Sequence, residues 1–184
     1  MFLSSCGSTF DLSKESVSKN YNTDTRVISL QDKAISWFVD FSRLSWTWEV
    51  VEVMLYDNNI EKIDVSGYTD LNRLNIANNK LTFFSDLKLP TSIRHLNASG
   101  NQLRTLDGID KLTQLKTLDL RNNDLNDDDL DKISELENLK VVLVSGNPDI
   151  SPDLINRLNN FSQKYIATIK NPDTLDVNKH SYLK

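Results

Sequence analysis

An eleven-residue motif recurs five times between residues 50 and 149, and it constrains the fold more than any other feature of the chain. The motif places aliphatic residues at positions 1, 4, 6 and 11 and asparagine at position 9, with departures at Ala98 and Asp149. The copies are VVEVMLYDNNI (50–60), LNRLNIANNKL (71–81), IRHLNASGNQL (93–103), LKTLDLRNNDL (115–125) and LKVVLVSGNPD (139–149). Their first residues lie 21, 22, 22 and 24 residues apart. A period of this length predicts a solenoid in which each copy forms one coil.

Within each copy, the apolar residues at positions 4 and 6 alternate with their neighbours, as in a strand that has one buried face. Leu74 and Ile76 are therefore expected to point inward, and Arg73, Asn75 and Ala77 to point outward. A single coil cannot bury its apolar face alone, so the coils must stack around a shared core.

The asparagines at position 9 are expected to form a structural column. An amide side chain both donates and accepts hydrogen bonds, so it can satisfy backbone groups where each strand turns. The five residues are Asn58, Asn79, Asn101, Asn123 and Asn147.

These copies resemble leucine-rich repeats, and the resemblance covers about 110 residues, over 50–160. It implies an α/β leucine-rich-repeat solenoid of about five coils, with a parallel concave sheet and a cap at each end. It also implies protein recognition without chemistry of the chain's own.

The segments that close each coil differ from one another. Pro90 predicts an extended segment over 87–91, because proline lacks an N–H group and disfavours helix before it. A short helical turn is expected over 106–112 and a helix over 127–137, which Asn126 or Asp127 would cap.

Outside the repeats, composition suggests the remaining boundaries. Residues 7–25 are mostly polar and are expected to form a flexible linker. Trp37, Trp46 and Trp48 predict an N-terminal cap over 26–49, with a helix over 31–42 and a strand over 45–49. Alternating apolar residues over 165–169 predict a closing strand in a C-terminal cap and tail over 161–184.

The outward positions of successive strands should form ladders across the concave face. This face carries five basic side chains against three acidic ones, in a chain of net charge −5. We therefore expect it to receive an acidic patch of a protein partner, or an anionic glycan. A solvated face without a partner remains the alternative. The expected partner-binding residues are Tyr56, Arg73, Asn75, Arg94, His95, Asn97, Lys116, Asp119, Arg121 and Lys140.

Several function classes find no support. The net acidity argues against nucleic acid as a partner, and the sequence contains no known catalytic motif or phosphate-binding loop. One cysteine and two histidines argue against a metal site built from these residues, and we expect no cofactor. A hydrolase with an unrecognised site remains a remote alternative.

The first six residues resemble the lipobox of bacterial lipoproteins, because Leu3-Ser4-Ser5 precedes the single cysteine, Cys6. Residues 1–6 would then be the remnant of a lipoprotein signal, although no apolar region precedes them as in a full signal. Acylated Cys6 would anchor the chain to a membrane of the bacterial cell envelope. The alternative is a cytoplasmic regulatory subunit that docks onto an enzyme, because the stretch 106–118 is similar to the repeats of such subunits.

Overall fold

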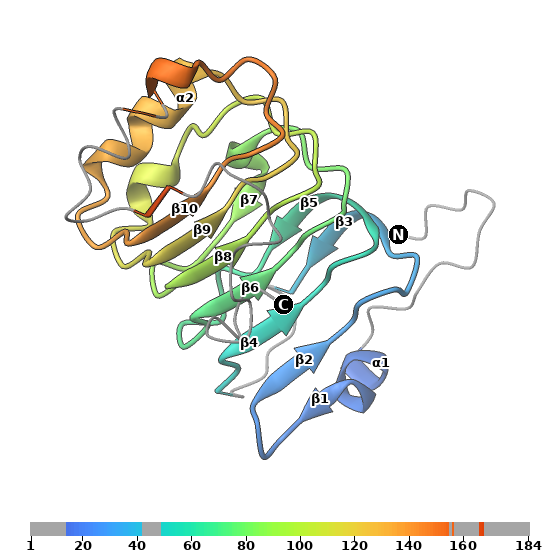
Figure 1. The fold of residues 1–184 in the computed structure, drawn as a ribbon. Helices are drawn as coiled ribbons and strands as arrows, with labels where there is room; N and C mark the ends of the chain where they lie inside the picture. The colour runs from blue at the N-terminus through green and yellow to red at the C-terminus, as the bar shows by residue number, and fades with distance from the viewer. Residues whose placement is uncertain (1–13, 42–48, 155, 157–165, 168–184) are drawn as a thin grey trace.

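The computed structural model describes residues 14–41, 49–154, 156 and 166–167. Its largest element is an eight-stranded sheet in the order β1-β2-β4-β6-β8-β9-β10-β11, whose central strands lie side by side in Figure 1. All neighbouring strands are parallel except β1 and β2. The predicted α/β solenoid with a parallel concave sheet is therefore confirmed. The strands are β1 (Tyr21–Asn22), β2 (Val27–Ser29), β4 (Glu52–Met54), β6 (Arg73–Asn75), β8 (His95–Asn97), β9 (Thr117–Asp119), β10 (Val141–Leu143) and β11 (Ile166–Ala167).

The core lies behind this sheet and consists of the aliphatic positions of the repeat. Leu74 and Leu118, at position 4, are buried, as are Ile76 and Leu120 at position 6. Each coil contributes its aliphatic side chains to one continuous cluster that runs from the first coil to the last. Stacking therefore buries a face that no coil could bury alone.

The parallel sheet begins one coil earlier than the five copies predicted. Strand β2 pairs with β4 in the register Val27↔Glu52, Ile28↔Val53 and Ser29↔Met54. Residues 25–35 (TRVISLQDKAI) thus form a sixth coil, in which Ile28, Leu30 and Ile35 are buried. This copy departs from the motif at two positions, because Thr25 replaces the aliphatic residue of position 1 and Lys33 the asparagine of position 9.

A second, three-stranded sheet forms the convex side of the first coils (Figure 1). Its order is β3-β5-β7, with β3 (Ser36–Asp40), β5 (Asn59–Asp64) and β7 (Leu87–Lys88), all parallel. The expected extended segment over 87–91 is confirmed by β7, but the helix predicted over 31–42 is wrong. Residues 36–40 pair with β5 instead, and aromatic and β-branched side chains favour such a strand.

Helical segments occur in the returning parts of the coils from residue 84 onward. These are η1 (Phe84–Asp86), η2 (Ile109–Lys111), α2 (Asp127–Asp131) and η3 (Lys132–Glu135). The turn expected over 106–112 is confirmed by η2. The helix expected over 127–137 begins as predicted, since the Asn126 side chain accepts a hydrogen bond from the Asp129 N–H. It narrows to a 3₁₀ helix after Asp131, and Leu130, Ile133 and Leu136 are its buried face.

The N-terminal end contains more structure than a linker over 7–25 and a cap over 26–49 would provide. Helix α1 (Lys14–Lys19) places Val17 in the core, and β1 pairs antiparallel with β2. The linker prediction is therefore wrong for residues 14–22. Phe41 is buried in the core, whereas Trp37 is 62% exposed. Cys6, Trp46, Trp48, the strand expected over 45–49 and most of the C-terminal tail lie outside the described residues.

Candidate functional site: the concave face

Four basic side chains follow one another along the amino ends of the concave strands. In the sheet, Arg73 is paired with His95. The Arg94 N–H donates to the Asn72 carbonyl at 2.9 Å, the Lys116 N–H to the Arg94 carbonyl at 2.7 Å, and the Lys140 N–H to the Lys116 carbonyl at 2.8 Å. Arg94, Lys116 and Lys140 therefore occupy equivalent positions in three consecutive coils. We call Arg73, Arg94, Lys116 and Lys140 the basic ladder.

The basic ladder is accessible and largely uncompensated. Arg73, Arg94 and Lys140 are exposed, and Lys116 is half-buried. Arg73 approaches Glu52 of the preceding coil at 4.0 Å, the outer limit of an ion pair. Within the described part of the chain, Arg94, Lys116 and Lys140 form no ion pair. Equal charges on neighbouring strands repel one another, so the free face has a reason to attract an anion.

His95 lies in the middle of the basic ladder. Its Nδ1 is 2.9 Å from the Thr117 Oγ1 of the next strand. The pKa of His95 is lowered to about 4, first by partial burial and then by the positive charges of Arg73, Lys116 and Arg94. The histidine is therefore neutral at pH 7, and the positive charge of the face comes from its arginines and lysines.

Three further residues of the expected binding set hold the backbone instead. Asn75, Asn97 and Asp119 occupy position 5, and the Oδ1 of each accepts a hydrogen bond at 3.1 Å from the N–H two residues later. Asn97 and Asp119 are buried. In these three coils, position 5 therefore turns the chain out of the strand and presents little side-chain surface to a partner.

Asp119 and Arg121 neutralise each other. The Arg121 Nη2 lies 2.6 Å from the Asp119 Oδ2, and its Nε lies 3.0 Å from the Oδ1. This bidentate pair compensates a carboxylate that is fully buried. The hydrogen bond to Asp119 raises the pKa of Arg121. Arg121 and the half-buried Tyr56 lie at the carboxyl ends of their strands, so neither joins the basic ladder.

The asparagines at position 9 form a buried column between the coils. Asn123 is representative: its Nδ2 donates to the Ala98 carbonyl of the preceding coil at 3.1 Å and to the Leu120 carbonyl of its own coil at 3.0 Å. Its Oδ1 accepts from the Leu103 N–H at 3.0 Å. Asn58, Asn79, Asn101 and Asn147 make the corresponding contacts. The Asn58 Oδ1 also accepts from the Lys33 N–H, which joins the sixth coil to the column.

The residues at position 8 form a second column, which the sequence analysis did not predict. Every residue in it has a left-handed backbone, with φ between 53° and 78°. Asparagine, aspartate and glycine tolerate this conformation best. Their recurrence one position before each asparagine of position 9 is the sequence signal that indicates such a column. The column comprises Asp32, Asp57, Asn78, Gly100, Asn122 and Gly146.

Two features are absent from the described residues: a metal-binding cluster and a membrane-spanning helix. No group of three or more histidine, cysteine, aspartate or glutamate side chains gathers there as a metal site would require. In the same part of the chain, no helix is long and apolar enough to cross a membrane.

Comparisons with known proteins identify the repeats. A family described as leucine-rich repeats in two copies matches residues 91–138. A protein of Dictyostelium discoideum, described as a probable inactive serine/threonine-protein kinase, is 30% identical over 91 residues. That match covers 48% of this chain but only 5% of the Dictyostelium protein.

Solved structures show the same architecture. An internalin, InlF of Listeria monocytogenes, matches with 28% identity and a TM-score of 0.56 over 66% of this chain and 35% of its own. A leucine-rich-repeat protein of Leptospira interrogans matches with 28% identity and a TM-score of 0.51 over 63% of this chain and 30% of its own. Internalin C2 of L. monocytogenes, at 21% identity and a TM-score of 0.53 over 79% of this chain and 80% of its own, shares the fold. The chain thus spans about a third of the first two structures.

Proposed function

Because this chain is a leucine-rich-repeat protein, we propose that it is a non-enzymatic module that binds another protein on the concave face of its parallel sheet. The basic ladder is the single observation that carries this proposal. Its four cations project from strands whose backbone is fixed by the sheet and by the asparagine column. A preformed surface loses little conformational freedom on binding, so its contacts contribute more fully to affinity.

The sign of the charge indicates the chemistry of the partner. Arg94, Lys116 and Lys140 stand side by side in a chain whose net charge is −5. An acidic patch on the partner would relieve the repulsion within the basic ladder. Such complementarity chiefly raises the association rate and selects against wrong partners. An anionic glycan would satisfy the same charges and is therefore an outcome that the experiment must separate.

The titratable groups of the face are consistent with binding rather than catalysis. With a pKa of about 4, His95 is a poor general base at pH 7. The Asp119 carboxylate is fully buried and bonded to Arg121, so it is not available to a substrate. These two observations support a module without chemistry of its own.

The proposal includes lipid attachment at Cys6, which the lipobox-like Leu3-Ser4-Ser5 supports and which would place the module on a bacterial envelope. Expression from the native upstream DNA in a bacterial host, with labelled palmitate, tests this part. Label that enters the protein but not its Cys6→Ala variant supports attachment. Label absent from both removes the envelope from the proposal and leaves a cytoplasmic regulatory subunit as the alternative.

Charge reversal on the basic ladder tests the binding proposal. The variant Arg94→Glu/Lys116→Glu is compared with Lys33→Glu/Lys80→Glu, which makes the same change at two exposed lysines outside the ladder. Capture of a partner from extracts of the source cells should be lost in the first variant, kept in the second, and weakened by salt. Protease treatment of the extract should abolish capture; binding that survives it identifies a glycan. Equal capture by both variants would reject the concave basic face as the binding surface.

A further inference from the structure

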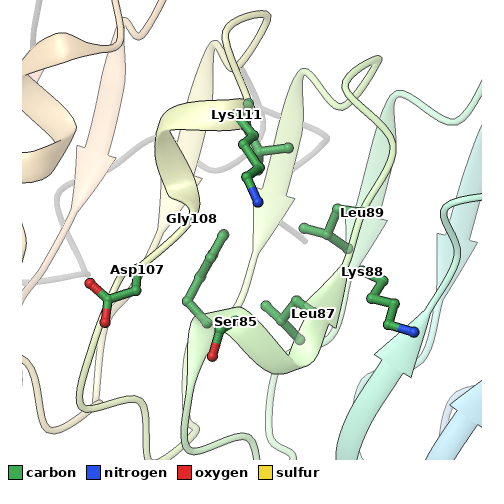
Figure 2. Close-up of a pocket in the computed structure, with 9 residues that line it drawn as sticks. Ser85, Leu87, Lys88, Leu89, Asp107, Gly108 and Lys111 are labelled. Atoms are coloured by element: carbon green, nitrogen blue, oxygen red, sulfur yellow. The ribbon is translucent and has the colours of Figure 1, made fainter.

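A pocket opens on the convex side, where two neighbouring coils separate (Figure 2). The coils still pair at Phe83 and Thr105, through a parallel bridge. Beyond that bridge, one coil continues as the extended β7 and the other turns into η2. The space between them is a pocket of about 360 Å³ whose apolar lining comes from Phe84, Leu87, Leu89 and Leu112.

One wall of this pocket is an open strand edge. Strand β7 lies at the end of the β3-β5-β7 sheet and pairs only with β5 there. The Lys88 carbonyl accepts from the Val65 N–H at 3.0 Å, so Lys88 directs its backbone groups toward β5. Successive residues of a strand direct these groups to opposite sides, so Leu87 and Leu89 direct theirs away from β5, toward the pocket. The Leu87 N–H donates to the Phe84 carbonyl, which leaves the Leu87 carbonyl and both groups of Leu89 open to a peptide. Within the described residues, the Leu89 N–H and carbonyl make no backbone hydrogen bond.

The pocket also contains one uncompensated positive charge. Two of its three charged residues pair outside it, Lys88 with Asp64 at 3.3 Å and Asp107 with Lys132 at 2.7 Å. The third, Lys111, extends from η2 into the space between η2 and β7 (Figure 2). Lys111 forms no ion pair with any described residue. The pocket therefore combines an apolar lining, a cation and open backbone groups.

We propose that this pocket binds an extended peptide segment of a partner protein that carries an apolar side chain and, two residues along, a carboxylate. The segment would pair with the backbone of Leu89, a mode of recognition in which a peptide adds a strand to an open sheet edge. Residues two apart share one face of a strand, so the apolar side chain enters the lining while the carboxylate meets Lys111. Pro90 has no N–H, which confines the pairing to Leu87–Leu89.

The site differs from the concave face in position and in ligand. The basic ladder offers several exposed cations to an acidic surface, whereas the pocket offers one cation beside apolar side chains and backbone groups. The two proposals can therefore fail separately. Because only a few hydrogen bonds and one apolar side chain are involved, we expect weak binding, with a Kd on the order of 0.1–1 mM.

The probe is the blocked peptide Ac-Thr-Leu-Thr-Glu-Thr-NH₂, titrated into the ¹⁵N-labelled full chain. Amide shifts should change at Leu87–Leu89 and over 108–112. Lys111→Glu should weaken binding about tenfold, because an attraction is replaced by a repulsion, and should then favour the peptide with Lys in place of Glu. The matched variant Lys33→Glu and the concave variant Arg94→Glu/Lys116→Glu should bind the probe as the unaltered chain does.

Backbone pairing is tested with the same peptide N-methylated at all five residues, so that none of them can donate a backbone hydrogen bond to the strand edge. It should bind at least about fivefold more weakly, since losing one or two hydrogen bonds removes about 1 kcal/mol or more. Equal binding of the methylated peptide, or the same shifts with octanoate, would assign the pocket to apolar anions and overturn the peptide proposal. Shifts absent from both segments, or unaffected by Lys111→Glu, would also overturn it.

Discussion

Asn78 and Gly100 occupy equivalent positions in neighbouring coils, and the amide oxygen of Asn78 fills the space where a side chain at Gly100 would begin. A Cβ built on Gly100 would lie 2.1 Å from the Asn78 Oδ1. Gly146 meets the Asn122 Oδ1 at the same distance. The last four residues of the left-handed column at position 8 therefore alternate between asparagine and glycine, because Asn78 and Asn122 each lean onto the glycine of the next coil.

Replacing Gly100 with alanine should destabilise the chain through both its backbone and this contact. At φ = +65°, alanine is strained, and its Cβ must also displace Asn78. We expect a loss of about 2–4 kcal/mol in the free energy of unfolding. Gly108→Ala is the control, since Gly108 has φ = +93° but no heavy atom within 4 Å of its Cβ position. Denaturant unfolding should show the smaller loss for Gly108→Ala, and equal losses would disprove the contact.

The asparagine column should dominate the polar contribution to stability. Asn123→Ala leaves the Leu103 N–H without its side-chain partner. It also removes one of the two amide donors to each of the buried Ala98 and Leu120 carbonyls. The expected cost is about 2–3 kcal/mol. Asn138→Ala is the matched control, because the exposed Asn138 makes one hydrogen bond, to the Thr113 carbonyl. A cost for Asn123→Ala no larger than that for Asn138→Ala would show that the column is dispensable.

The Asp119–Arg121 ion pair predicts that a single variant is less stable than the double variant that also removes the buried charge. Arg121→Ala leaves the fully buried Asp119 carboxylate without its guanidinium and should cost about 3 kcal/mol. Adding Asp119→Asn removes that charge but keeps an oxygen for the backbone N–H of residue 121. The double variant should therefore unfold at higher denaturant than Arg121→Ala alone. If the second substitution lowers stability further, the buried charge is not the source of the cost.

His95 should make the fold less stable in acid. Its pKa is about 4 in the folded chain and 6.5 ordinarily, so the unfolded chain binds the proton first as pH falls. Stability should consequently decrease from pH 6.5 toward pH 4. His95→Gln, which cannot take up a proton, should flatten the profile of unfolding midpoint against pH in this window. A slope unchanged by His95→Gln would assign the pH dependence to other groups.

The sequence was sufficient for the solenoid because its signal repeats. Residues such as Leu74 and Leu118 recur with the same neighbours, so one strand-like pattern predicts the buried face of every coil. Residues 25–35 show where this reasoning fails: Thr25 at position 1 and Lys33 at the asparagine position hid a complete coil, although Ile28 and Leu30 retained the pattern. The Asn58 side chain of the next coil bonds to the Lys33 N–H, so the asparagine column reaches this coil although the coil has no asparagine at that position.

The concave site was only partly predictable, because the position of a residue in a strand indicates where its side chain points but not how exposed that side chain is. Alternation places Asn97 and Asp119 outward, yet both are buried because their side chains turn back onto the backbone two residues later. The basic ladder is different, since long charged side chains at strand ends remain in solvent. The strand β3 was missed because the apolar spacing over 31–42 also fits a helix, and only its pairing with β5 decides between them.

Site-specific photo-cross-linking tests the central claim, that partners bind the concave face, most directly. The photoreactive residue p-benzoylphenylalanine is placed at Arg94 in the basic ladder or at Glu61, an exposed residue of the convex strand β5. Illumination with the captured partner should yield a cross-linked product from position 94 and none from position 61, and salt should suppress it. A product from position 61 alone would place the binding surface on the convex side and contradict the proposed function.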